Sequence, residues 1–114
     1  MEFMLILSED PELIATEDQR RLAVQQVGEY AMGLVGDGTL TGGAPLHPVH
    51  QAKKVRTREG RQRVLDGPFA ESKEVIAGYF VIEAADIDAA VQIAARCPNA
   101  AFGSVEVREI VPMG

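Results

Sequence analysis

The chain has 114 residues, of which 46% are hydrophobic and 25% charged, and its formal net charge is −6. This length fits one domain, residues 1–114, and the hydrophobic content excludes a disordered acidic tail. No apolar run approaches the roughly 20 residues that a membrane-spanning helix needs, so we expect no membrane partner. The single cysteine and the absence of a recognisable export signal favour a cytoplasmic location.

The first half of the chain predicts a strand followed by a helix. Residues 2–7 form a short apolar run of strand formers that ends in a turn at Ser8-Glu9-Asp10-Pro11. Thr16 and Gln19 have the spacing of a capping box, so a helix should begin there. The Gly-Asp-Gly sequence at residues 36–38 should end this helix. Between these limits, apolar residues recur at helical spacing, namely Val24, Val27, Ala31, Leu34 and Val35.

The second half of the chain predicts strands around an inserted hairpin. A short strand over residues 39–41 leads into an irregular segment in which Pro45 and Pro48 disfavour helix. Residues 49–58 and 61–65 flank Glu59-Gly60, which predicts a β-hairpin with a two-residue turn. The remaining predicted elements are a turn at residues 66–69, a strand over residues 76–83, a helix from the cap Asp86 to Pro98 and Asn99, and a strand over residues 105–108.

This order of elements predicts an α+β fold, the ferredoxin-like sandwich, with one mostly antiparallel sheet and both helices on one face. The apolar segments at residues 2–7 and 79–82 have apolar side chains on both faces of the sheet, yet two helices cover only one face. We therefore expect a homodimer in which a second copy packs sheet to sheet, forming a dimeric α+β barrel. The alternative is that the inserted hairpin folds back over the open face.

Two histidines and one aspartate are the candidate catalytic residues. His47 and His50 lie at i and i+3, but the prolines rule out a helix, and in an extended chain the imidazoles would point to opposite faces. A zinc site is therefore disfavoured. The histidines are either exposed loop residues or, for one of them, a general base. Asp66 is the best carboxylate candidate because it ends a strand beside Gly67; the alternative is that it only bonds the backbone of its own turn.

Neither a metal nor a cofactor is expected. Cys97 falls in the last turn of the second helix, where the helix dipole raises the pKa of a thiol, which suits a small core residue. The glycines at positions 36, 38, 42 and 43 follow a helix and lack the Gly-Lys-Ser/Thr sequence of a phosphate-binding loop.

Six of the eleven basic residues lie between residues 51 and 63, a window with a net charge of +5, which leaves −11 for the rest of the chain. The predicted turn places Arg58 opposite Arg61 and Arg56 opposite Arg63 on one side of the hairpin, where like charges repel. Full solvation, contacts with the other subunit or a small anionic ligand would each make this cluster tolerable. The acidic remainder of the chain and its few aromatic residues argue against nucleic acid as a partner.

Three segments carry a family resemblance: Asp66-Gly67-Pro68-Phe69-Ala70-Glu71-Ser72-Lys73-Glu74, Gly78-Tyr79-Phe80 and Ala94-Ala95-Arg96-Cys97-Pro98. They resemble the DGPF subgroup of the YCII-related proteins, and the similarity runs nearly from end to end. The resemblance implies a ferredoxin-like fold in a dimeric α+β barrel. It also implies a family-level association with extracytoplasmic-function sigma factors, and therefore a signalling or regulatory context.

For related YCII proteins, the resemblance further implies a His-Asp pair in a cleft, with the histidine on the first helix. The corresponding stretch here, residues 25–29, has no histidine, and Val27 takes its place, so only Asp66 carries over through a matching motif. Two hypotheses follow. One is a noncatalytic homodimer that binds a small ligand, with an anion as one option, or a partner protein, with Arg56, Arg58, Arg61 and Arg63 as ligand-binding residues. The other is a small-molecule enzyme that uses Asp66 with His47 or His50 for acid–base chemistry.

Overall fold

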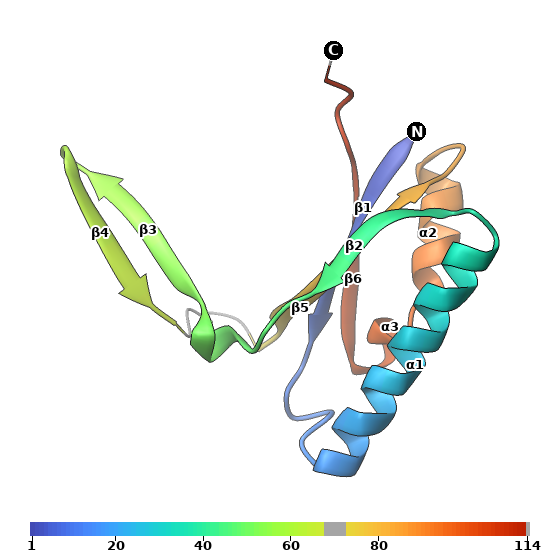
Figure 1. Ribbon diagram of the computed structural model, residues 1–114, viewed down its shortest axis with the longest axis horizontal. Coiled ribbons are helices and arrows are strands. Elements are labelled where there is room, and N and C mark those ends of the chain that lie inside the picture. Colours follow the sequence, from blue (N-terminus) through green and yellow to red (C-terminus); the bar gives the residue numbers. More distant parts are fainter. Residues whose placement is uncertain (68–72, 114) are drawn as a thin grey trace.

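The computed structural model describes residues 1–67 and 73–113. Its elements, in chain order, are β1 (Glu2–Glu9), α1 (Glu17–Gly36), β2 (Leu40–Pro45), the 3-10 helix η1 (Val49–Gln51), β3 (Lys53–Arg58), β4 (Arg61–Asp66), β5 (Val75–Glu83), α2 (Ile87–Ala95), α3 (Asn99–Phe102) and β6 (Gly103–Glu109). Figure 1 shows two parts, a sheet covered by helices on one side and a separate hairpin that projects away from it. None of the described helices is both long and apolar enough to cross a membrane.

Four strands form the main sheet in the order β2-β5-β1-β6, and every pair of neighbours is antiparallel. The helices lie together on one face of this sheet (Figure 1). This α+β arrangement, with an antiparallel sheet, has the strand order of the ferredoxin-like sandwich that the sequence predicts.

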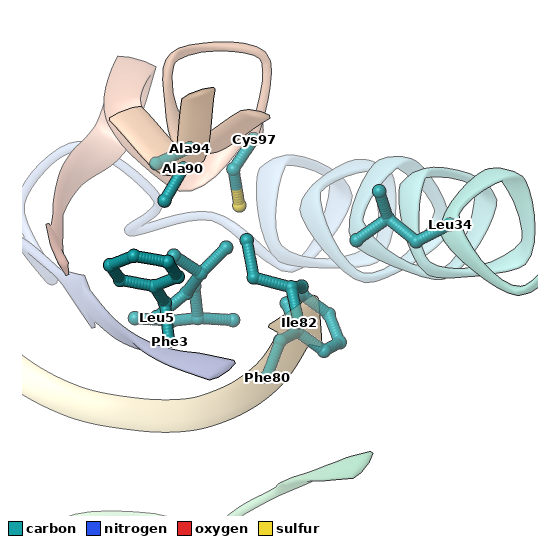
Figure 2. Packing of buried hydrophobic residues seen from close by; sticks show 9 residues of the cluster. Phe3, Leu5, Leu34, Phe80, Ile82, Ala90, Ala94 and Cys97 are labelled. Atoms are coloured by element: carbon teal, nitrogen blue, oxygen red, sulfur yellow. The ribbon is translucent and has the colours of Figure 1, made fainter. Parts of the chain in front are cut away.

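The core lies between the sheet and the helices. Phe3, Leu5 and Ile82 are the largest fully buried side chains. Figure 2 shows these strand residues pointing toward Ala90, Ala94 and Cys97, with Leu34 approaching from α1. The small residues on α2 allow this helix to lie close to the sheet, because their side chains fill little space between the two layers.

Both helix starts follow the predicted capping residues. The Thr16 hydroxyl accepts a hydrogen bond from the Gln19 backbone N–H, and the Gln19 side chain accepts one from the Thr16 N–H. The Asp86 carboxylate accepts a hydrogen bond from the Ala89 N–H in the same way. These bonds satisfy backbone donors that the first turn of a helix leaves free.

Two strand predictions were wrong. Strand β1 continues to Glu9, through two residues of the predicted turn. Residues 42–45, expected to be irregular, belong to strand β2 and pair with β5. Gly43 makes this pairing possible: its φ is +147°, and a Cβ there would lie 2.6 Å from the Tyr79 carbonyl oxygen.

Two short helices were also missed. Residues 49–51 form the 3-10 helix η1 directly after Pro48, whose fixed φ suits the position before a helical turn. Pro98 and Asn99, expected only to end the second helix, instead begin the four-residue helix α3.

The second face of the sheet carries an apolar patch that no described element covers. Its centre consists of two cross-strand pairs, Met4 opposite Val81 and Ile6 opposite Tyr79. The inserted hairpin does not fold over this patch, because β3 and β4 form their own two-stranded sheet and project away from the main sheet (Figure 1). Val55 and Val64 on the hairpin remain 60% and 61% exposed. The alternative expectation, that the inserted hairpin folds back over the open face, is therefore wrong.

Candidate functional site

A cavity of about 640 Å³ lies between α1 and the main sheet, near the ends of β2 and β5. Its walls are mostly apolar, with contributions from α1, β5 and the segment that follows β2. This volume falls in the usual range of small-molecule pockets, about 300–1,000 Å³, which are likewise largely apolar with a few placed polar groups. We take this cavity as the candidate site.

One wall of the cavity is a stripe of small and apolar residues on α1. Val24, Val27, Gly28 and Ala31 line it and follow the i, i+3, i+4, i+7 spacing of one helix face. A Cβ added at Gly28 would meet nothing within 4 Å. The missing side chain at this position therefore leaves open volume between the helix and the sheet.

Both histidines line the cavity. His47 lies between the two prolines after β2, and His50 lies in η1. An extended chain would have sent the two imidazoles to opposite faces, but residues 49–51 form a 3-10 turn, and both histidines are among the residues that line the cavity. The sequence singled out both histidines as candidates, but the expectation of an extended chain through them was wrong.

A second polar group lies where β1 meets the start of α1. The Arg20 guanidinium donates to the Glu9 carboxylate across 3.3 Å, and both residues line the cavity. Asn99, which is 2% exposed, also lines it and donates from its side-chain amide to the Ser8 carbonyl oxygen. The cavity thus has an apolar centre with hydrogen-bonding groups at its margins.

Asp66 is not among the residues that line this cavity. It ends β4 on the hairpin, where its carboxylate pairs with the Lys53 ammonium at 2.5 Å across the two strands. Most of the motif that drew attention to Asp66, residues 68–72, lies outside the described residues. A catalytic role for Asp66 with a histidine stays a prediction.

The four candidate ligand-binding arginines lie on the hairpin as the two-residue turn predicts. Arg56 is opposite Arg63, and Arg58 is opposite Arg61. All four are exposed, and none lines the cavity. Their role as ligand-binding residues also stays a prediction, and it would concern a surface separate from the cavity.

Tyr30 and Cys97 do not line the cavity: Cys97 belongs to the core, and Tyr30 packs against it. Burial raises the pKa of Tyr30 to about 12, and its hydroxyl donates to the Ile93 carbonyl oxygen at 2.7 Å. Burial likewise raises the pKa of the Cys97 thiol, which is 2% exposed. A protonated, buried thiol is a poor nucleophile, so this residue acts in packing.

Within residues 1–67 and 73–113, no three side chains of the metal-binding types come together in an arrangement that could hold an ion. Sequence reasoning missed Glu9, Arg20 and Asn99 as site residues because they meet only through the tertiary fold. The signal that could have found the cavity is Gly28, a residue without a side chain in the middle of an apolar helix face.

The fold and site define a single α+β sandwich with a small-molecule-sized cavity between its first helix and its sheet. The chain belongs to the YCII-related domain family, whose model matches residues 1–114. An uncharacterised protein of Rhizobium meliloti strain 1021 is 35% identical over 96 residues, which cover 82% of this chain and 76% of that protein.

Among solved structures, the fold is similar to that of 5-chloro-2-hydroxyhydroquinone dehydrochlorinase, TftG, from Burkholderia phenoliruptrix AC1100, in complex with 2,5-dihydroxybenzoquinone. The TM-score is 0.56 at 12% identity, and the match covers 97% of this chain and 94% of the other. This likeness concerns the fold alone. The expected link to sigma factors stays a prediction.

Proposed function

We propose that this protein binds a small, largely apolar molecule in the cavity between α1 and β5. The observation that carries the proposal is the cavity itself, about 640 Å³ and walled mainly by apolar side chains. Burying an apolar ligand there contributes roughly 25 cal/mol for each Å² removed from water. The chain also omits a side chain at Gly28, where any larger residue would reduce the available space.

The margins of the cavity define which polar groups the ligand would carry. His47 and His50 offer imidazole donors and acceptors on one side, and Arg20 offers a guanidinium on another. Because Arg20 is already paired with Glu9, this margin has no net charge from the pair. The site therefore favours a neutral ligand with hydroxyl or carbonyl groups over a strongly anionic one.

Filling the cavity from α1 tests this proposal. We expect Gly28→Leu to weaken binding of naphthol, a fluorescent planar probe with one hydroxyl, by about tenfold or more, because the leucine side chain would enter the cavity. Leucine also favours helix over glycine, so the variant should fold. Equilibrium fluorescence titration measures the dissociation constant.

Gly33→Leu is the matched control. Gly33 lies on the same helix, has nothing within 4 Å of an added Cβ and does not line the cavity. This variant should bind naphthol as the unaltered protein does. Equal affinities for all three proteins, or no measurable binding by the unaltered protein, would count against a ligand site in this cavity.

We further propose that the protein is a homodimer in which a second copy covers the open face of the sheet. Met4, Ile6, Tyr79 and Val81 form an apolar patch there that no described element of the same chain covers. Sheets commonly pack face to face through such residues, and a two-fold axis lets one patch serve both subunits. This arrangement would form the expected dimeric α+β barrel.

A second candidate function is proton transfer on a molecule bound in the same cavity. It is favoured by the position of both histidines on the cavity wall, since imidazole is the commonest general base. The fold neighbour is named as a dehydrochlorinase, so 5-chloro-2-hydroxyhydroquinone is a reasonable first substrate to try.

For this candidate, we expect His47→Ala or His50→Ala to lower kcat/KM for that substrate by about a hundredfold, the usual contribution of a general base. Asp66→Asn tests the predicted role of the hairpin carboxylate in the same assay. No turnover by the unaltered protein would leave the binding function and remove the enzymatic one for this substrate.

A further inference from the structure

We propose that the β3–β4 hairpin is an arm that binds the acidic surface of a second copy of this chain. The inference rests on the proposed dimer and adds what holds its subunits together at the periphery. It also gives a function to the strongest charge feature of the sequence, which the cavity does not use.

The arginine face of the hairpin brings like charges together, and no ion pair within the described hairpin neutralises its arginines. Arg56 and Arg63 face each other, as do Arg58 and Arg61, so two like-charged pairs stack on one side of a two-stranded sheet. Like charges directly opposite each other destabilise a hairpin. Within residues 1–67 and 73–113, none of these guanidiniums forms an ion pair with a carboxylate. Solvation makes this exposed cluster tolerable, and anionic groups from elsewhere would turn the repulsion into attraction.

The hairpin is placed to reach a second subunit. In Figure 1 it projects from the main sheet on the side opposite the helices, which is the side of the open face. A copy docked on the open face would therefore lie beside the hairpin. The hairpin packs little against its own subunit, since nearly all of its residues remain exposed.

The second copy has the charge that the arm needs. Outside residues 51–63 the chain carries a net charge of −11. The open face itself presents three carboxylates, Glu2, Glu83 and Glu106, at positions that alternate with the buried side. Glu83 pairs with the N-terminal ammonium and Glu106 with Arg108, so most of the negative charge available to the arm lies around this face. The same negative charge would repel nucleic acid from any surface near the arm, so a second copy fits better than a phosphate backbone.

The test is the dimer dissociation constant, measured by sedimentation equilibrium at low and high salt. Removing two arm charges with Arg56→Gln and Arg63→Gln should raise this constant about tenfold in about 50 mM salt, and the effect should shrink in about 500 mM salt as charges are screened. These substitutions also relieve the repulsion within the hairpin, so its folding should not suffer.

The matched control removes the same amount of charge elsewhere, with Arg21→Gln and Arg96→Gln, both exposed and away from the arm. Its dissociation constant should stay within about twofold of the unaltered protein, because exposed ion pairs contribute little. A dimer that responds equally to both double variants would overturn the arm while leaving the dimer in place. An unaltered protein that stays monomeric at every concentration would overturn both.

Fluorescence anisotropy with a labelled DNA duplex tests whether the arm binds nucleic acid instead of a second copy. We expect no binding by the unaltered protein at about 150 mM salt. Tight binding that the Arg56→Gln and Arg63→Gln variant loses, with no change in dimerisation, would show that the arm binds nucleic acid and would contradict the proposal.

Discussion

Tyr30 is the residue whose environment makes the sharpest prediction about stability. Its hydroxyl on α1 donates to the Ile93 carbonyl oxygen on α2, and its ring lies 5.9 Å from that of Phe80. The bond therefore joins the two main helices above the sheet. We expect Tyr30→Phe to lower the free energy of unfolding by about 1 kcal/mol at neutral pH, because the part-buried bond between the helices is lost and the Ile93 carbonyl keeps only its bond from the Arg96 backbone N–H.

The same residue predicts a dependence on alkaline pH. Burial raises the pKa of Tyr30 from 10.0 to about 12, so the folded state disfavours the tyrosinate. The contribution of the hydroxyl is complete below pH 10.0 and is lost as the pH rises through about 12. Urea unfolding of both proteins between neutral and alkaline pH measures this difference. A gap that stays constant across the range would show that Tyr30 ionises as freely in the folded protein as in the unfolded one.

For single residues, the sequence named candidate side chains more readily than it predicted where they lie in the fold. His47 and His50 were singled out as candidates, and the structure places both among the residues that line the cavity, while their catalytic role stays a prediction. Glu9 and Arg20 were not, because nothing in the local sequence shows that a strand end and a helix start will meet. Contacts between distant segments depend on the packing of whole elements, which periodicity does not encode.

Two neighbouring residues of strand β5 allow the stability of the fold and the stability of the proposed dimer to be tested separately. Phe80 is 8% exposed and faces the helices, whereas Val81 faces the open side of the sheet. We expect Phe80→Glu to prevent folding, because an unpaired carboxylate in the core costs several kcal/mol. Val81→Glu should instead leave the fold intact and produce a monomer. Circular dichroism and sedimentation velocity measure the two properties.

These neighbouring substitutions introduce the same side chain, so each is the control for the other. If Val81→Glu remains a dimer of unchanged affinity, the open face is not the interface. If Phe80→Glu folds normally, the assignment of this side chain to the core would be contradicted.

Element prediction succeeded where a local hydrogen bond or a turn decides the outcome. The Thr16 and Asp86 caps and the hairpin register around Glu59-Gly60 follow from chemistry within a few residues. It failed at residues 42–45, where the glycines weaken strand propensity but allow close approach to β5. That benefit exists only once the partner strand is present.

The whole molecule combines two surfaces that serve different purposes. The helix side of the sheet holds the core and the cavity, and the open side carries the apolar patch that we assign to a second copy. The sequence predicted the α+β sandwich from element order, and it predicted the open face from strands that are apolar on both sides. It did not predict the cavity, because the cavity depends on where a packed layer lacks a side chain, as at Gly28.

The most direct test of a ligand site in this cavity is methyl-detected NMR during titration with naphthol. We predict shift changes at Val27, Ala31 and Ile76, which line the cavity, and none at Val55 and Val64 on the hairpin. Changes confined to the hairpin or the open face, or no changes at saturating probe, would contradict the assignment.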